Sequence, residues 1–481
     1  MKTVKTLLNL ITLSFISLII ASCAINPVTG ERELMLVSEQ TELEWGNSIY
    51  PDALWGEVGG GGKYHDPELE KYLERIVKDL NAASHRPNLP VDFVIQNSSV
   101  PNAWAIPGHV SMTRGLLAGL ENEAQFAFVM GHEMGHVAAR HSAAQMSRNI
   151  LVQAGLVATG IALDNKENSE WILGAGAIGA NLFMLKYSRD QEYQSDRLGT
   201  LYMSKIGYDP HEAIKAHQRL DQISDEYLTR MGKQSREGSF LSEWLSTHPP
   251  MHERVQSINS AISNLPPYSI IGDGKETYTF QRMTSKLRNA NKSYIHYDLA
   301  LRDFNDERIS EAESNLSKAL QIDANQAPFY NLSGLIEIKK GNTQLGLKNF
   351  QKAIEIDRNY QPAYHSIGFV YYMEKNYQEA LGYLKKSLEL YPDNIPSHYF
   401  AGMSYFKIRN YKSAIPHLGI FASANSKHNE IHGILGICYE NVNDIASAFN
   451  AYKKQVEVAP NNEMGRYAYE RLKILSQKLQ K

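Results

Sequence analysis

The chain has few cysteines, no excess of positive charge and no multi-span membrane domain. Only Cys23 and Cys438 occur among its 481 residues, which excludes a disulfide framework and a cysteine-rich metal site. The formal net charge is −3, so the composition gives no sign of a basic surface for nucleic acid. Hydrophobic residues make up 43% and charged residues 21% of the chain, as expected for a globular protein of two or three domains.

The N-terminus predicts a targeting segment, residues 1–22. Lys2 and Lys5 form a short positive region, and the apolar region that follows, Leu7–Ile20, is short for a membrane span. Cleavage before Cys23 resembles a bacterial lipoprotein signal, which implies a lipidated Cys23. Ala24 follows it and, by the same resemblance, favours the periplasmic side of the outer membrane. The alternative is a plain secretory signal and a soluble periplasmic protein.

Two further apolar stretches cover residues 150–163 and 171–187. Each is shorter than a usual membrane span. They predict either core or interfacial helices or a shallow membrane contact.

An apolar helical segment, residues 129–138, contains His132-Glu133-x-x-His136. Two histidines four residues apart lie on one face of a helix, so both imidazoles can reach one metal ion. Glu133 lies between them, where a carboxylate can act as general base on a water molecule. The pattern is typical of zinc metallopeptidases. Taken alone, it is also compatible with an ordinary amphipathic helix.

A second pair of acidic residues, Glu192 and Asp196, is also spaced four apart in a segment that reads as helical. A Zn²⁺ ion with two histidine ligands needs a third protein ligand if one position is left for water, and Glu192 can supply it. Asp196 can accept a hydrogen bond from the other ring nitrogen of a zinc histidine. By itself such a pair would instead indicate a solvated helix face.

These motifs together resemble the gluzincin metallopeptidases of the HtpX and CAAX prenyl protease family, over about residues 24–262. The resemblance implies a zincin-like α+β domain with a small sheet and one Zn²⁺ per chain. It assigns the metal to His132, His136 and Glu192, and catalysis to Glu133 and Asp196.

Two other segments are similar to the same family. Residues 102–117 resemble its substrate-binding edge strand, although one glycine follows Pro107 where the family often has two. Residues 246–254 match its His-Pro element, in which His248 would close the site on the metal or stabilise the oxyanion. The residues that the resemblance assigns to substrate binding are Asn102, Trp104, His109, Val110 and Arg254.

After a predicted linker at 264–292 the chain becomes repetitive. Glycine recurs every 34 residues, and bulky residues recur at the same period, which is the tetratricopeptide signature. These glycines are Gly334, Gly368, Gly402 and Gly436. We predict five helical hairpins over 293–462 and a capping helix over 463–481. The fold class is therefore mainly α: a metalloprotease domain, 23–263, followed by an α-solenoid.

A gluzincin domain joined to such repeats resembles the BepA-type β-barrel assembly-enhancing proteases. The resemblance implies a zinc endopeptidase of the bacterial envelope that degrades or helps assemble misfolded outer-membrane proteins. Its repeats would recruit substrates or partners, among them the outer-membrane assembly machinery. The alternative is a chaperone or scaffold whose metal site is silent or self-inhibited.

Overall fold

The computed structural model describes residues 23–56, 60–158, 187–232 and 251–479. The predicted signal peptide, most of the two apolar stretches between 150 and 187, and His248 lie outside the described residues. The chain divides into two compact units, Met1–Asp298 and Leu299–Lys481. Among the helices that the structure describes, none is long and apolar enough to cross a membrane.

The first unit is built around a three-stranded sheet in the order β3-β5-β4. β3 (Asp92–Gln96) runs parallel to β5 (His109–Thr113), whereas β4 (Ala103–Ile106) pairs with β5 as an antiparallel hairpin. The hairpin turns at Gly108, whose φ of +96° is a conformation that residues with a Cβ atom rarely adopt. β4 therefore lies at an edge of the sheet.

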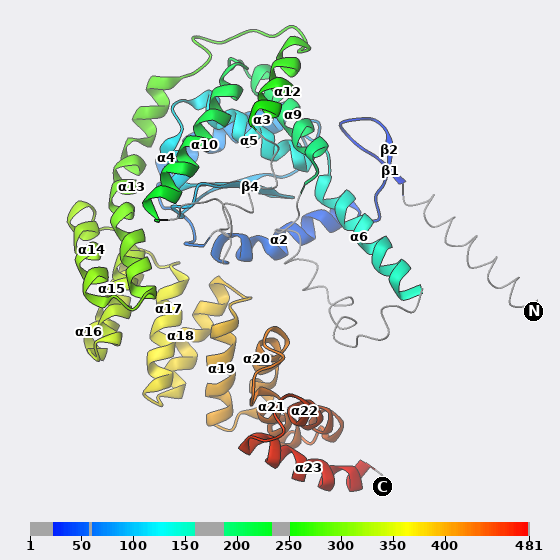
Figure 1. Ribbon diagram of the computed structural model, residues 1–481, viewed down its shortest axis with the longest axis vertical. Coiled ribbons are helices and arrows are strands. Elements are labelled where there is room, and N and C mark those ends of the chain that lie inside the picture. The colour runs from blue at the N-terminus through cyan, green and yellow to red at the C-terminus, as the bar shows by residue number, and fades with distance from the viewer. Residues whose placement is uncertain (1–22, 57–59, 159–186, 233–250, 480–481) are drawn as a thin grey trace, which may run out of the picture. The chain divides into compact units, whose positions relative to one another are not determined.

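Helices cover both faces of this sheet (Figure 1). α3 (Pro67–Ala83) and α5 (Glu123–Ala138) form the main core with one face. α2 (Glu39–Trp55) and α6 (His141–Ala158) contribute to a second core on the other face. Because successive strand residues point to opposite faces, Phe93 joins the first core and Val94 the second.

The other described elements of this unit are a small hairpin and further helices. They are β1 (Cys23–Ile25), β2 (Arg32–Leu34), α4 (Arg114–Gly119), α9 (Arg189–Lys205), α10 (Glu212–Arg230) and α12 (Met251–Ser263). A long helix, α13 (Thr277–Asn305), then begins inside the predicted linker and ends in the second unit. Its Phe280 and Leu287 are buried in the same core as α5. The later half of the predicted linker is thus packed structure, because these apolar side chains lie on the buried face of a helix.

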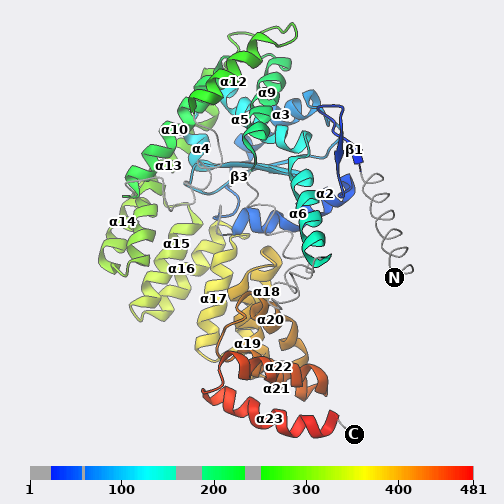
Figure 2. The same cartoon turned by 45° about the vertical axis from the view of Figure 1, so that its right-hand side comes forward.

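The second unit is a series of paired helices (Figure 2). They are α14 (Ile309–Ile322), α15 (Ala327–Lys339), α16 (Thr343–Ile356), α17 (Gln361–Met373), α18 (Tyr377–Leu390), α19 (Ile395–Lys407), α20 (Tyr411–Ala424), α21 (Ile431–Asn441), α22 (Ile445–Val458) and α23 (Glu463–Leu479). The predicted fold class, a small-sheet domain followed by helical repeats, is confirmed.

The 34-residue pattern has a direct packing explanation. A Cβ atom added at each repeating glycine would lie 2.4–2.6 Å from the bulky residue sixteen positions later, on the other helix of the hairpin. These pairs are Gly334 with Phe350, Gly368 with Leu384, Gly402 with Leu418 and Gly436 with Tyr452. The repeating glycine and the repeating bulky residue are therefore the two sides of one close helix crossing.

Candidate metal centre

Helix α5 carries the His-Glu-x-x-His motif through the middle of the first unit. Asn122 caps its start by accepting a hydrogen bond from the backbone N–H of Gln125, 2.9 Å away. The helix is apolar and buried on almost every side, as expected for a helix that crosses a core. His132 and His136 are both buried, and their Nε2 atoms lie 3.2 Å apart. Both imidazoles therefore present Nε2 to the same point.

Helix α9 lies directly against α5 because glycines line the crossing. A Cβ atom at Gly199 would lie 2.8 Å from the backbone nitrogen of His132, and one at Gly131 would lie 3.1 Å from the Cα of Gly199. This approach brings Glu192 to the two histidines: its Oε2 is 3.6 Å from Nε2 of His132, and its Oε1 is 3.6 Å from Nε2 of His136. One ligand atom from each of the three residues lies within 4.8 Å of the others, and all three are buried.

The donor set has the chemistry of a metal site. Two neutral imidazole nitrogens and one carboxylate oxygen are the ligands of many catalytic zinc centres, which keep one position open. Glu192 is 0% exposed, and a carboxylate at that depth needs positive charge or hydrogen-bond donors nearby; Nη2 of Arg254 lies 3.9 Å from its Oε2. The three residues therefore fit a divalent cation such as Zn²⁺.

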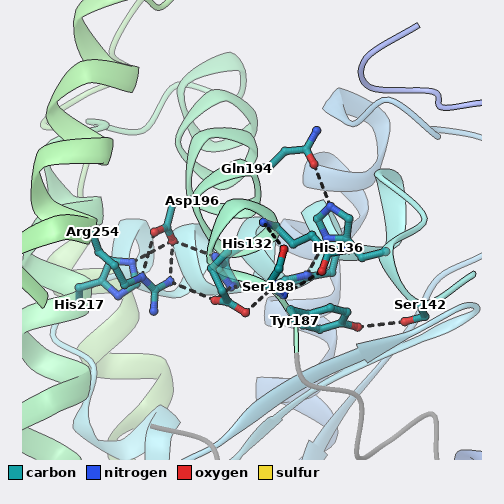
Figure 3. A network of polar contacts seen from close by, with 12 residues as sticks. His132, His136, Ser142, Tyr187, Ser188, Gln194, Asp196, His217 and Arg254 are labelled. Carbon is teal, nitrogen blue, oxygen red and sulfur yellow. Dashed lines mark hydrogen bonds and ion pairs between the residues drawn. The ribbon is translucent and has the colours of Figure 1, made fainter. Parts of the chain in front are cut away.

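Asp196, one turn after Glu192, is the centre of a buried polar network (Figure 3). Its Oδ1 lies 2.9 Å from Nδ1 of His132 and 3.1 Å from Nε2 of His217 on α10. Arg254 of α12 donates to both carboxylate oxygens, from Nε at 2.9 Å and from Nη2 at 2.6 Å. Burial alone would raise the pKa of Asp196, but the charge of Arg254 and the hydrogen bonds from His217 and His132 hold that pKa well below its usual value. Asp196 is thus a carboxylate that fixes one ring nitrogen of His132.

His136 has a separate set of neighbours, contributed by the start of α6 and the segment before α9. Its Nδ1 lies 2.8 Å from Nδ1 of His141, whose Nε2 lies 2.8 Å from Oε1 of Gln194. Burial lowers the pKa of His141 to about 4. Tyr187 stacks on the ring of His136 with centroids 3.9 Å apart, and its hydroxyl lies 2.9 Å from Oγ of Ser142 (Figure 3).

Glu133 projects from the same helix next to the ligand group. Burial raises the pKa of its carboxyl to about 7, with the charge of His132 opposing and that of Glu192 adding to the shift. A carboxyl group with a pKa near neutrality can both take and release a proton at physiological pH. The site thus combines three potential metal ligands with one proton-transfer group.

Comparison with known families agrees with this geometry. Residues 67–262, which include every ligand and both buried polar networks, match Peptidase family M48. The chain carries an M48 peptidase domain. Residues 327–360 match a tetratricopeptide repeat, and residues 347–421 match the family described as anaphase-promoting complex, cyclosome, subunit 3. The predicted combination of a metallopeptidase domain and tetratricopeptide repeats is confirmed.

Several curated proteins are similar to part of this chain at modest identity. The mitochondrial metalloendopeptidase OMA1 of Schizosaccharomyces pombe is 27% identical over 236 residues, covering 48% of this chain and 64% of that protein. The β-barrel assembly-enhancing protease of Escherichia coli is 24% identical over 247 residues, covering 50% of this chain and 48% of that protein. The metalloprotease YcaL of Escherichia coli is 29% identical over 200 residues, covering 40% of this chain and 71% of that protein. The chain thus spans about half the length of the β-barrel assembly-enhancing protease.

Four of the residues predicted to bind substrate are buried in the described structure. Trp104 is 6% exposed, and its indole N–H donates to Oε1 of Gln96 at 3.0 Å inside the second core. Val110 is 1% exposed in the main core, and Asn102 is 4% exposed at the start of β4. Arg254 is held by Asp196, as described above. The strand residues are buried because helices cover both faces of the sheet, and substrate binding at these positions stays a prediction.

His109, also predicted to contact substrate, lies against α2. Its ring stacks on Tyr50 with centroids 4.1 Å apart, and its Nε2 lies 2.8 Å from Oδ1 of Asn47 on α2. These contacts attach the start of β5 to α2. His248, the predicted closing residue, lies outside the described residues, and Cys23, the predicted lipidation site, is the first residue of β1.

Three polar residues that surround the ligand group are not predicted by the sequence analysis. His141 follows the motif by only five residues, but spacing alone does not reveal that the chain turns back at that point. Gln194 lies between Glu192 and Asp196 on α9, and glutamine is not a residue type that indicates a metal site. His217 falls on the apolar stripe of α10, between Ala213 and Leu220, and a histidine in such a stripe is the one signal that could have found it.

Proposed function

We propose that the chain is a zinc-dependent endopeptidase of the bacterial cell envelope. The observation that carries the proposal is the buried group of His132, His136 and Glu192 with Glu133 beside it. When bound there, Zn²⁺ would act as a Lewis acid that activates water and polarises the scissile carbonyl.

Side chains near the metal site would carry out the other steps of the reaction. Glu133 would take a proton from the attacking water and return it to the leaving amine. Asp196 keeps His132 in the tautomer whose Nε2 is unprotonated, because Nδ1 must carry the hydrogen that Asp196 accepts. Arg254 and His217 keep Asp196 ionised and in place.

An extended substrate would bind through backbone hydrogen bonds along β4. Among the strands that the structure describes, β4 pairs with β5 alone, and it packs beside α5, the helix that carries the two histidines. A peptide can add to such an edge as a further strand. This mode depends on the backbone of Ala103–Ile106 and is compatible with the buried side chains of Asn102 and Trp104. It favours unfolded or flexible substrates.

The envelope role rests on the leader sequence and on the similarity to the β-barrel assembly-enhancing protease of Escherichia coli. We infer that the substrates are misfolded or misassembled outer-membrane proteins, and that the repeats recruit them or the assembly machinery. Lipidation of Cys23 would keep the enzyme on the periplasmic side of the outer membrane. A Cys23→Ser variant should then move from the membrane to the soluble fraction, and retention in the membrane would reject the anchor.

The decisive experiment for the enzymatic proposal is Glu133→Gln in the full chain. This variant keeps the shape of the side chain and all three proposed metal ligands but removes the base. We expect normal zinc content by mass spectrometry and loss of cleavage of an unfolded model protein such as reduced casein. If cleavage persists with normal zinc content, the mechanism is wrong. If the variant also restores the envelope of a deletion strain as well as the natural chain does, the scaffold function is favoured instead.

A further inference from the structure

The turn between α5 and α6 brings a third histidine back to the metal motif. Arg140, in the left-handed region with φ of +56°, reverses the chain, a conformation uncommon for a residue with a side chain. Its guanidinium holds the turn: Nε lies 3.1 Å from Oε2 of the buried Glu42, and Nη2 donates to the carbonyl of Val37 at 2.7 Å. The next residue, His141, begins α6 with its side chain facing His136.

His141 is 3% exposed and lies in a continuous polar chain. Its Nδ1 is 2.8 Å from Nδ1 of His136, and its Nε2 is 2.8 Å from Oε1 of Gln194. Tyr187 covers the face of the His136 ring. Stacking on the ring face and a polar contact at Nδ1, the ring nitrogen that points away from Glu192, therefore both hold His136.

The positions of the hydrogens in this chain follow from the metal site. Nε2 of His136 points to the ligand group and must be unprotonated to bind a metal. Nδ1 then carries the hydrogen and donates it to His141. His141 must accept at Nδ1, so its own hydrogen lies on Nε2, where the carbonyl oxygen of Gln194 accepts it. One tautomer of each imidazole therefore satisfies every hydrogen bond from His136 through His141 to Gln194.

We propose that His141 is a positioning residue for the metal: a neutral imidazole, oriented by Gln194 and by the Arg140 turn, that holds His136 with Nε2 ready to coordinate. The proposal rests on the proposed zinc site. It makes the two histidine ligands unequal, because His132 donates to a carboxylate whereas His136 donates to a neutral ring. A neutral acceptor polarises its donor less than a carboxylate does, so the support of His136 depends mainly on geometry.

The test is the Zn²⁺ affinity of the full chain, measured by competition with a chromophoric chelator. His141→Leu fills a similar space but cannot accept a hydrogen bond, whereas His141→Asn can place an oxygen near the position of Nδ1. We expect His141→Leu to bind Zn²⁺ about 10–100-fold more weakly, His141→Asn to stay within about threefold of the natural chain, and Gln194→Ala to fall between them.

The matched control is His85, a histidine of the same unit whose Nδ1 lies 2.8 Å from the hydroxyl of Tyr202, away from the ligand group. His85→Leu should leave Zn²⁺ affinity unchanged. Circular dichroism checks that each variant is folded. If His141→Leu does not fold, Gln194→Ala is used for the test in its place.

Two results would overturn the role of His141. One is that a folded His141→Leu variant binds Zn²⁺ as tightly as the natural chain does. If His141→Leu does not fold, the same result for Gln194→Ala counts instead. The other is equal weakening in His141→Leu and His141→Asn, which would indicate packing alone. Failure of the zinc site itself looks different: the natural chain would bind no Zn²⁺, or His136→Ala would bind it equally well.

Discussion

The ion pair of Asp196 and Arg254 gives the sharpest prediction about stability. Both residues are buried, at 0% and 6% exposure, and Arg254 donates to both carboxylate oxygens. Arg254→Met would leave a buried carboxylate without its cation. Breaking a buried pair in this way typically costs about 3–5 kcal/mol. We expect that loss in the free energy of unfolding of the first unit.

The double variant Asp196→Asn with Arg254→Met removes both charges. It should cost less than the sum of the two single variants, because no uncompensated charge remains, and the coupling energy should be about 2 kcal/mol or more. A matched exposed pair is Lys78 with Glu74, whose side chains are 63% and 34% exposed. Lys78→Met should cost no more than about 0.5 kcal/mol.

The assay is urea unfolding followed by tryptophan fluorescence. All five tryptophans lie between Trp45 and Trp244, so the signal reports on the first unit and not on the repeats. An Arg254→Met variant as stable as Lys78→Met would refute the reasoning. Strict additivity of Asp196→Asn and Arg254→Met would also refute it, since it would mean that the two charges do not compensate each other.

Three further predictions concern packing, pH and metal. Gly199→Ala places a Cβ atom 2.8 Å from the backbone nitrogen of His132 and should destabilise the first unit by about 1–3 kcal/mol; Gly382→Ala, in open space on α18, should be neutral or stabilising in the same urea series. Burial lowers the pKa of His365 from its usual 6.5 to about 4. The His365 imidazole therefore binds a proton more readily in the unfolded repeats than in the folded repeats. Up to about 3 kcal/mol of stability is lost as the pH falls from 6.5 to 4. His365→Asn should reduce that loss in thermal melts of the repeats by circular dichroism, and an unchanged pH profile would reject the assignment. Removing metal with a chelator should lower the melting temperature detected by tryptophan fluorescence, and an identical melt with and without chelator would contradict a metal bound to the folded state.

The predictions that succeeded rest on short-range periodicity. Four-residue spacing on a helix defines a common face, and it predicts that His132 lies beside His136 and Glu192 beside Asp196. The 34-residue spacing of glycines works in the same way, because each repeat places its glycine at an equivalent helix crossing.

What the sequence could not predict depends on contacts between distant segments. The alternation of a strand shows that Trp104 and Val110 take definite faces, but it does not show that helices cover both faces of the sheet. Arg254 ends the segment 246–254 that resembles the family's His-Pro element, and only the approach of α12 to α9 shows that its partner is Asp196. Likewise, the apolar residues of α13 indicate a helix but not the core that receives Phe280.

The glycine crossing of α5 and α9 has a consequence for recognising distant relatives of this chain. The third ligand reaches the two histidines only because small residues, Gly131 and Gly199 above all, let two backbones touch. A sequence with His-Glu-x-x-His but larger residues at these places could not bring its glutamate equally close. The length of chain between the two helices matters far less, since it does not enter the crossing. A search that weights the glycines beside the ligands should therefore tolerate large insertions in between and still separate metal-competent chains from chance matches.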